Sequence, residues 1–265
     1  VFVWVRIPCS FLLGIGPLIR WKRDNLSKLV KPMLVSGAFS LGLSALIVAL
    51  LADRFSGTAF AGWVMAFWII FMHGFELYER ATHRHTFLKG LTKLPRSHWA
   101  MMCGHIGLAV TVIGIAMVQN YSIERDVRLA PGESYQLEEY DFLFTGVRDK
   151  DGPNYDGYIA DFEITHDGKY LNTLHAEKRF YRTAKSMMTE AAIDRGISRD
   201  LYIAMGERLD DNRSWAVRIY YKPFVRWIWA GSLIMALGGA LAISDKRYRF
   251  RKSSKKNAKS KEQEA

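Results

Sequence analysis

The sequence predicts an α-helical membrane protein with an inserted all-β domain. Its 265 residues are 49% hydrophobic, and the hydrophobic residues are concentrated in long blocks although the mean hydropathy, −0.04, is near zero. Lys and Arg gather on alternate sides of these blocks, and the polar region 119–224 alternates apolar and polar residues as half-buried strands do. We therefore expect a bundle of about five transmembrane helices, the first of them incomplete, that carries an all-β domain on its outer side.

Long apolar blocks divide the chain. A spanning helix needs about 20 predominantly apolar residues. The blocks that reach this length are Met33–Ala52, Ala59–Tyr78, Trp99–Val118 and Val225–Ser244. A fifth block, Val1–Ile19, begins without methionine and contains Arg6 and Pro8. We expect it to be a spanning helix entered partway and the sequence to be a piece of a longer protein.

The net charge of +11 is distributed as a membrane topology requires. Segments 20–31, 79–98 and 245–265 hold five, five and nine Lys or Arg, whereas segment 53–58 holds one. Region 119–224 holds 15 basic residues against 19 acidic ones. By the positive-inside rule, the three basic segments face the cytoplasm. The charge therefore indicates a membrane as the partner and excludes nucleic acid.

The same pattern predicts the domain organisation. We expect transmembrane helices in residues 1–118 with cytoplasmic loops at 20–32 and 79–98, a β-domain on the outer side at 119–224, a last transmembrane helix at 225–244 and a basic cytoplasmic tail at 245–265. The tail should be disordered because its charged composition buries too little apolar area to offset chain entropy.

Region 119–224 reads as an all-β sequence of about six strands, which predicts a small β-sandwich or an open barrel. Asp167-Gly168 lies between two strand-like runs, where a tight hairpin needs residues that tolerate positive φ. WAVRIYY (215–221) reads as another strand. We expect one short helical piece in this region, near Met187–Ile193.

His105 and His73 are the residues that could carry chemistry, because both lie inside apolar blocks. An ionisable side chain in a spanning helix faces protein, a cavity or a cofactor, since lipid offers it no hydrogen bond. His105 has small or apolar helical neighbours and fits an axial ligand to haem iron, but equally a hydrogen bond between helices. His73 is followed by Glu76 near the cytoplasmic end of its block, so we expect a structural or interfacial role for it.

The other histidines and the cysteines point to no chemistry. His83, His85 and His98 lie in the predicted cytoplasmic loop, where no Cys or carboxylate has ligand spacing, so a solvated loop is expected. Cys9 and Cys103 lie in apolar blocks and form no CxxC pair. We expect both thiols to be small buried helix residues.

Several long stretches resemble the C-terminal part of the CcmF family, the haem lyase subunit of bacterial cytochrome c maturation. The stretches are GIGPLIRWKRD (14–24), GHIGLAVTVIGIAMVQNYSIERDVRLAPGE (104–133), AEKRFYRTAKSMMTEAAID (176–194), RDLYIAMGE (199–207) and WAVRIYYKPFVRWIWAGSLIMALGGAL (215–241). They occur in order and cover nearly the whole chain except the tail. The resemblance implies a bacterial inner-membrane protein whose outer side is the periplasm.

The resemblance also implies an activity, a cofactor and partners. The family joins haem to the CxxCH thiols of apocytochrome c. A CcmE-type haem chaperone brings the haem, and a CcmH-type subunit delivers the apocytochrome. The family further holds a haem b within the membrane, and His105, in GHIGLAV, matches the position of one axial ligand of its iron. The resemblance does not extend to His73.

Part of the family's active site is absent from this sequence. No WWD segment occurs, although that motif marks the haem-handling surface of the family. The resemblance places the periplasmic haem-holding histidines and the second axial ligand in the part of the family that precedes this chain. We therefore expect the N-terminal part of the haem lyase as a partner, assign no catalytic residue, and expect no ligation by this chain alone.

Two rival interpretations are non-enzymatic. In the first, the chain is a membrane-anchored scaffold subunit in which His105 makes only a packing hydrogen bond. In the second, it is a transporter, which predicts internal repeats or paired broken helices. We find neither in the sequence, because Pro8 and Pro17 interrupt only the first block.

Overall fold

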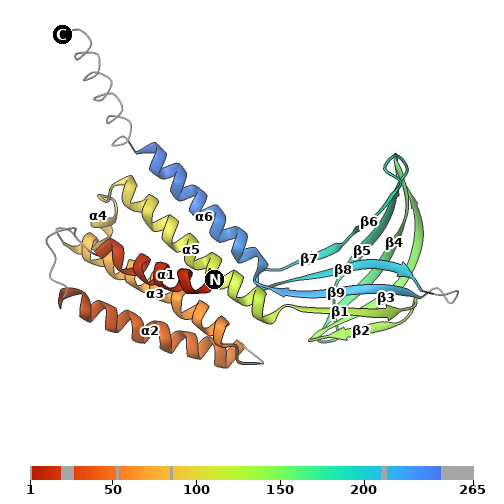
Figure 1. Ribbon diagram of the computed structural model, residues 1–265, viewed down its shortest axis with the longest axis horizontal. Coiled ribbons are helices and arrows are strands. Elements are labelled where there is room, and N and C mark those ends of the chain that lie inside the picture. Colours follow the sequence, from red (N-terminus) through yellow and green to blue (C-terminus); the bar gives the residue numbers. More distant parts are fainter. Residues whose placement is uncertain (1, 19–26, 52–53, 84–85, 210–213, 246–265) are drawn as a thin grey trace, which may run out of the picture. The chain divides into compact units, whose positions relative to one another are not determined.

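The computed structural model describes residues 2–18, 27–51, 54–83, 86–209 and 214–245 (Figure 1). The predicted disorder of the basic tail falls on residues that, except for Asp245, lie outside this description. The chain divides into two compact units, one made of residues 1–116 and 227–265 and the other of residues 117–226. Each unit is described by itself.

The helical unit contains the predicted apolar blocks as helices. The elements are α1 (Phe2–Ile15), a short 3-10 helix (Gly16–Leu18), α2 (Ser27–Leu51), α3 (Gly57–Thr82), α4 (Phe87–Leu91), α5 (Arg96–Tyr121) and α6 (Val225–Ser244). Four of the described helices, α2, α3, α5 and α6, are long and apolar enough to cross a membrane. Helix α1 has 14 residues, about 21 Å at 1.5 Å per residue, against a hydrocarbon core of about 30 Å. The prediction of several helices that can span a membrane is confirmed by these four.

Helices α1 and α2 both lie against α3 (Figure 1). Aromatic side chains make these contacts. The Trp68 indole on α3 stacks on the Phe11 ring of α1, with centroids 5.0 Å apart, and its Nε1–H donates to the Phe11 carbonyl at 3.1 Å. The Phe71 ring of α3 contacts the Phe39 ring of α2, with centroids 6.0 Å apart. Helix α3 therefore contacts both α1 and α2 and is the central helix of this group.

Small residues bring α5 close to α6 and to α3. A Cβ added at Gly107 would lie 2.6 Å from the Gly231 carbonyl oxygen, and one at Gly238 would lie 2.7 Å from the Ala100 carbonyl oxygen. On α3, a Cβ added at Gly62 would lie 2.5 Å from the Cβ of Ala116. Small residues let helix backbones approach where lipid gives no hydrophobic drive for association.

The second unit is a two-layer β-structure. Its strands are β1 (Ile123–Leu129), β2 (Ser134–Leu137), β3 (Tyr140–Asp151), β4 (Tyr155–His166), β5 (Lys169–Tyr181), β6 (Ser186–Glu190), β7 (Ala192–Arg195), β8 (Arg199–Arg208) and β9 (Trp215–Pro223). They form a four-stranded sheet in the order β1-β9-β8-β7 and a five-stranded sheet in the order β2-β3-β4-β5-β6, both antiparallel (Figure 1). The predicted all-β fold is confirmed, but the expectation of six strands was too low.

One local prediction in this region was wrong. The segment Met187–Ile193, expected to contain a short helix, is part of the edge strands β6 and β7. The Met187 and Met188 side chains are both about half exposed, so β6 lacks the alternation of buried and exposed residues that signals a strand. Its strand conformation comes from pairing with β5, in which Phe180 lies opposite Met187.

The inner faces of the two sheets share one apolar core. Phe142 and Phe144 on β3 and Phe162 on β4 are fully buried, and the Phe144 and Phe162 rings stack at 4.8 Å. From the other sheet, Ile203 on β8 and Ile219 on β9 are also fully buried. These side chains recur at every second position, as a sheet with one face against a core requires.

The predicted hairpin between β4 and β5 is present. Asp167 has φ of 50° and Gly168 has φ of 72°, which is the pair of left-handed residues that a two-residue type I′ turn needs. Asp and Gly tolerate this conformation better than most residues do. The sequence therefore encodes this turn through two neighbouring residues alone.

Polar side chains tie the two sheets together at the edge of the core. Lys178 on β5 is buried, and its ammonium group donates to the Gly206 carbonyl at 2.7 Å and to the Glu207 carboxylate at 2.5 Å on β8. Arg199 on β8 donates to the Tyr140 hydroxyl on β3 at 3.0 Å. The buried charge of Lys178 is thus paired, which limits the cost of its desolvation.

Candidate functional site

His105 lies on α5, nine residues after the first residue of the helix, Arg96. At 1.5 Å per residue it is about 13 Å along the axis from that end. Its side chain is partly buried. A Cβ built on the preceding residue, Gly104, meets no atom of the structure within 4 Å, so the surface beside His105 has open space.

The structure pairs His105 with His73 of α3. The Nε2 atom of His73 and the Nδ1 atom of His105 are 2.6 Å apart, and the two rings meet edge to face with an interplanar angle of 86°. His73 is fully buried and also contacts its own helix, with Nδ1 at 2.8 Å from the Ile69 carbonyl oxygen. Two histidines that are 32 positions apart in sequence therefore form one site.

The hydrogen-bond partners assign a proton to each ring. A carbonyl oxygen can only accept, so Nδ1 of His73 carries the proton that it shares with Ile69. A neutral imidazole then has a lone pair on its other nitrogen, so Nε2 of His73 accepts and Nδ1 of His105 donates. This leaves a lone pair on Nε2 of His105, which makes no hydrogen bond within the described part of the chain.

The donor chemistry of this pair fits a metal ligand. A neutral imidazole with one nitrogen hydrogen-bonded and the other carrying a free lone pair is the form in which histidine coordinates iron. The interhelical hydrogen bond expected as the alternative for His105 is also present, but it uses only Nδ1. The two expectations for His105 are therefore compatible, because each uses a different ring nitrogen.

Sequence reasoning missed the pairing and expected a structural or interfacial role for His73, whose side chain is fully buried in the structure. Helix α3 continues to Thr82, so His73 is nine residues from its end, as His105 is from the start of α5. Both ends border the same connecting segment, which contains α4, so the two histidines lie equally far from it along α3 and α5. This equality could be read from the sequence once the helix bounds are known.

A second polar cluster lies closer to the same helix ends. Glu76 of α3 is buried and forms an ion pair with Arg80 one turn later. Its Oε2 atom is 3.7 Å from Nε2 of His98, and among the described residues neither of these two atoms has a hydrogen-bond partner. The expectation that His98 is a solvated loop residue was wrong, because it lies buried in the first turn of α5.

Within the described part of the chain, neither His83 nor the two cysteines belong to a site. His83 is exposed, and His85 lies outside the described residues. Cys9 and Cys103 are free thiols, as expected, but Cys9 is exposed and not buried. Its exposure follows from its position on α1, whose contacts with α3 involve the face that carries Phe11.

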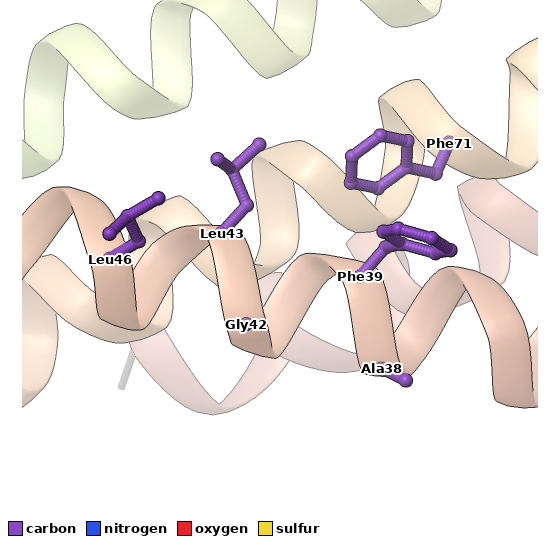
Figure 2. Close-up of a pocket in the computed structure, with 6 residues that line it drawn as sticks. All are labelled: Ala38, Phe39, Gly42, Leu43, Leu46 and Phe71. Atoms are coloured by element: carbon purple, nitrogen blue, oxygen red, sulfur yellow. The ribbon is translucent and has the colours of Figure 1, made fainter.

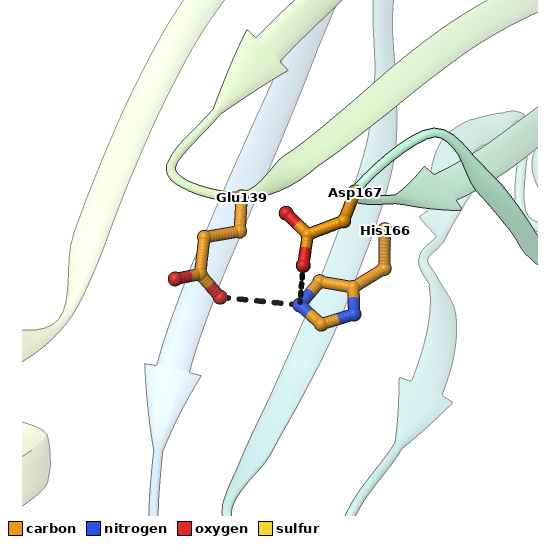
Figure 3. A group of neighbouring side chains, drawn as sticks. All are labelled: Glu139, His166 and Asp167. Carbon is orange, nitrogen blue, oxygen red and sulfur yellow. Dashed lines mark hydrogen bonds and ion pairs between the residues drawn. The ribbon is translucent and has the colours of Figure 1, made fainter.

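The described residues contain one group with metal-ligand spacing (Figure 3). Nε2 of His166 lies 3.1 Å from a carboxylate oxygen of Glu139 and 3.9 Å from one of Asp167. Both carboxylates are exposed, and the His166 ring stacks on Tyr140 at 4.7 Å. These contacts account for the position of His166 at the end of β4, next to the turn.

An ion-pair ladder covers the outer face of the five-stranded sheet. Partial burial of the Asp161 carboxyl group raises its pKa, but hydrogen bonds from Arg148 and His175 outweigh this effect and leave the pKa below its ordinary value. In the same way, Lys150 and Arg179 outweigh burial at Glu177 and hold the pKa of that carboxyl group low. The carboxylates of this ladder are therefore ionised at neutral pH and act as structural partners.

The pocket between α2 and α3 is apolar (Figure 2). Its lining residues are Ala38, Phe39, Gly42, Leu43, Leu46 and Phe71. None of these side chains has a polar or titratable group. The pocket can therefore hold an apolar chain but offers no ligand or acid–base group, and the His105–His73 pair is the better candidate for chemistry.

Comparisons with known proteins agree on one family. A family model described as the CcmF C-terminal beta-sandwich matches residues 120–223. The chain is 50% identical over 250 residues to the cytochrome c-type biogenesis protein CcmF of Haemophilus influenzae and 48% identical over 258 residues to that of Escherichia coli K12. These alignments cover 94% and 97% of this chain, which spans 38% and 39% of the length of these relatives.

A solved structure has the same fold. It is described as Cytochrome c Heme Lyase CcmF and superposes on this chain with a TM-score of 0.73 at 20% sequence identity. The superposition covers 92% of this chain and 40% of the solved one. The chain is therefore a multi-pass membrane protein that belongs to the CcmF family of cytochrome c-type biogenesis proteins, and it matches the C-terminal part of these proteins.

Proposed function

We propose that this chain is the C-terminal part of a haem lyase of cytochrome c maturation, in which Nε2 of His105 provides one axial bond to a haem b in the membrane. The observation that supports this most is the free lone pair on Nε2 of His105 at depth in α5, next to open space at Gly104. Membership of the CcmF family provides the reaction class.

The residues of this chain bind and orient rather than catalyse in this proposal. A haem held by two neutral imidazoles is a low-spin one-electron carrier whose potential depends on burial and on hydrogen bonds to its ligands. His105 binds the iron, and His73 holds the His105 ring. The close approach of α5 and α6 at Gly107 and Gly231 keeps the ligand-bearing helix in place.

The rest of the active site lies outside this chain in our proposal. The second axial ligand, the surface that handles the incoming haem and the thioether chemistry belong to the N-terminal part of the haem lyase. The partners are that part, a CcmE-type haem chaperone, a CcmH-type subunit and apocytochrome c. The chain alone is not an active lyase.

The proposed location is the bacterial inner membrane, with the β-unit in the periplasm. The basic residues of segments 20–31 and 79–98 support a cytoplasmic position for these loops, and the balanced charge of region 119–224 supports translocation. This gives domain bounds of 1–118 for the first helices, 119–224 for the periplasmic domain, 225–244 for the last helix and 245–265 for the cytoplasmic tail.

The test is His105→Ala in the complete haem lyase, with His166→Ala on the exposed hairpin as the matched histidine control. Losing only an outer partner of a metal ligand typically costs 10–100-fold in affinity, so losing the ligand itself should cost at least as much, and we expect His105→Ala to reduce the haem b bound per protein by about tenfold or more. His166→Ala should leave it unchanged. Reduced-minus-oxidised absorption spectra and the haem content of the purified protein measure this.

The second candidate function is a non-catalytic scaffold subunit. The hydrogen bond between His73 and His105 supports it, because this bond alone satisfies one nitrogen of each ring. An unchanged b-type spectrum in His105→Ala at equal protein yield would favour the scaffold. Recovery of the low-spin spectrum of His105→Ala by added imidazole would favour haem ligation, since the small molecule replaces the missing ring.

A further inference from the structure

We propose that His73 is a positioning residue for His105. Its Nε2 atom accepts the Nδ1 proton of His105, and this bond fixes both the tautomer and the ring orientation in which Nε2 of His105 offers its lone pair. The inference rests on the proposed haem-ligand role of His105. It adds a residue to which neither the sequence pattern nor the family resemblance assigned a function.

The first support is the chain of three polar groups that ends on the helix backbone. The Ile69 carbonyl accepts from Nδ1 of His73 at 2.8 Å, and Nε2 of His73 accepts from Nδ1 of His105 at 2.6 Å. The opposite direction would require His73 to hold protons on both nitrogens and to carry a charge among apolar helices, which is costly. The carboxylate one turn away, Glu76, is already paired with Arg80.

The second support is the difference in burial between the two rings. His73 has no exposed surface, whereas His105 is only partly buried. His73 is held by its own helix four residues back, so its acceptor atom is fixed relative to α3. The inner ring is therefore an anchor, and the outer ring is the one that can reach a ligand.

The contact has a measurable electronic consequence. An acceptor on the second nitrogen of a ligating histidine raises the basicity of the coordinating nitrogen. A more basic ligand stabilises ferric over ferrous iron, so the bond from His73 lowers the reduction potential of the haem. Removing the acceptor should therefore raise the potential.

The decisive variants are His73→Leu, which removes the acceptor, and His73→Gln, whose amide oxygen can still accept. The neighbouring Met72, which is also fully buried on α3, gives the packing control Met72→Leu. We expect His73→Leu to change the ratio of ferric to ferrous affinity by 10–100-fold, which is a rise in midpoint potential of about 60–120 mV at 59 mV per tenfold for one electron. His73→Gln should recover most of the shift, and Met72→Leu should show none.

A haem-free measurement separates this inference from the proposed function. In the complete protein without haem, ¹⁵N NMR of labelled histidine distinguishes protonated Nδ1 from protonated Nε2, and His105→Ala identifies the signals of His105. We expect His105 to carry its proton on Nδ1 in the parent and to lose this preference in His73→Leu. This measurement does not depend on bound haem, so it can still be made if the His73 variants bind too little haem for absorption spectra.

The outcomes are distinct. If His105→Ala keeps the haem spectrum, the proposed function fails, whatever the NMR shows. If His105→Ala loses the haem but His73→Leu keeps both the parental potential and a protonated Nδ1, the positioning role is wrong and the ligand role stands. If Met72→Leu shifts the potential as much as His73→Leu does, the effect is one of packing and the inference is overturned.

Discussion

The two nitrogens of His105 have different surroundings, and this difference defines the candidate site. Nδ1 is 2.6 Å from Nε2 of His73, while Nε2 has no hydrogen-bond partner in the described structure. Burial alone could not have produced this asymmetry, because a ring surrounded evenly by apolar side chains would leave both nitrogens unsatisfied. The site therefore depends on a second polar residue at the same depth.

The ion-paired carboxyl group of Asp161 predicts how the stability of the β-unit depends on pH. Arg148 and His175 lower the pKa of the folded carboxyl group despite its partial burial, so the unfolded chain binds the proton more readily. The resulting stabilisation is fully present above the unfolded pKa of about 4 and is lost as the pH falls through the lower folded pKa. Asp161→Asn should lower the thermal midpoint of the β-unit at pH 7 and reduce its loss of stability between about pH 5 and pH 2.

Thermal unfolding followed by far-ultraviolet circular dichroism at several pH values measures this effect. Asp149→Asn is the matched control, because Asp149 is exposed on β3 of the same sheet and forms no ion pair among the described residues. Equal acid sensitivity of the parent and Asp161→Asn would contradict the prediction.

Individual residues show where sequence reasoning reached the site and where it did not. His105 was identifiable because an imidazole inside an apolar block needs a polar contact. His73 carried the same signal, but its partner depends on which helices pack together, and hydropathy does not encode that. His98 was assigned to a loop because α5 begins at Arg96, three residues before the apolar block.

Among the elements, α5 and α6 approach each other closely at glycines. Besides the Gly107 contact, a Cβ at Gly231 would clash with the Thr111 hydroxyl and the Gly107 carbonyl oxygen. Gly239, on the same helix, has no atom within 4 Å of such a Cβ. The two positions therefore form a natural pair of test and control.

We expect Gly231→Leu to separate the two helices and Gly239→Leu to leave them in place. Overpacking of a tight contact typically costs about 1–3 kcal/mol, so Gly231→Leu should unfold in detergent at a lower temperature and should bind less haem in the complete protein. Tryptophan fluorescence during thermal unfolding and the haem content report the two effects. Similar losses of thermal stability and haem in both variants would show that a large side chain anywhere on α6 has this effect. The contact with α5 would then not be the cause.

The elements differ in how far the sequence determines them. The spanning helices were predictable because about 20 apolar residues in lipid have few alternatives to a helix. The hairpin at Asp167-Gly168 was predictable from the φ preference of two residues. The edge strand β6 was not, because Met187 and Met188 are both exposed and its strand conformation comes from pairing with β5. The edge strand β7 depends in the same way on pairing with β8.

For the whole molecule, the proposed orientation can be tested with single cysteines. In a background with Cys9 and Cys103 replaced by Ser, Lys169→Cys lies on the exposed start of β5 and Lys89→Cys on the exposed helix α4. We expect a membrane-impermeant maleimide to label Lys169→Cys in intact spheroplasts and Lys89→Cys only after the membrane is permeabilised. The reverse pattern would place the β-unit in the cytoplasm and would contradict the charge argument.

The pairing of β1 with β9 has a consequence for biosynthesis. Leu129 lies opposite Trp215, so the first strand of the β-unit pairs with its last, and every other strand is encoded between them. A nascent chain therefore carries β1 without a neighbour until β9 has been made, just before translation reaches α6. During this interval the unpaired β1 is exposed to aggregation and to proteases. The rate of translation determines how long the interval lasts.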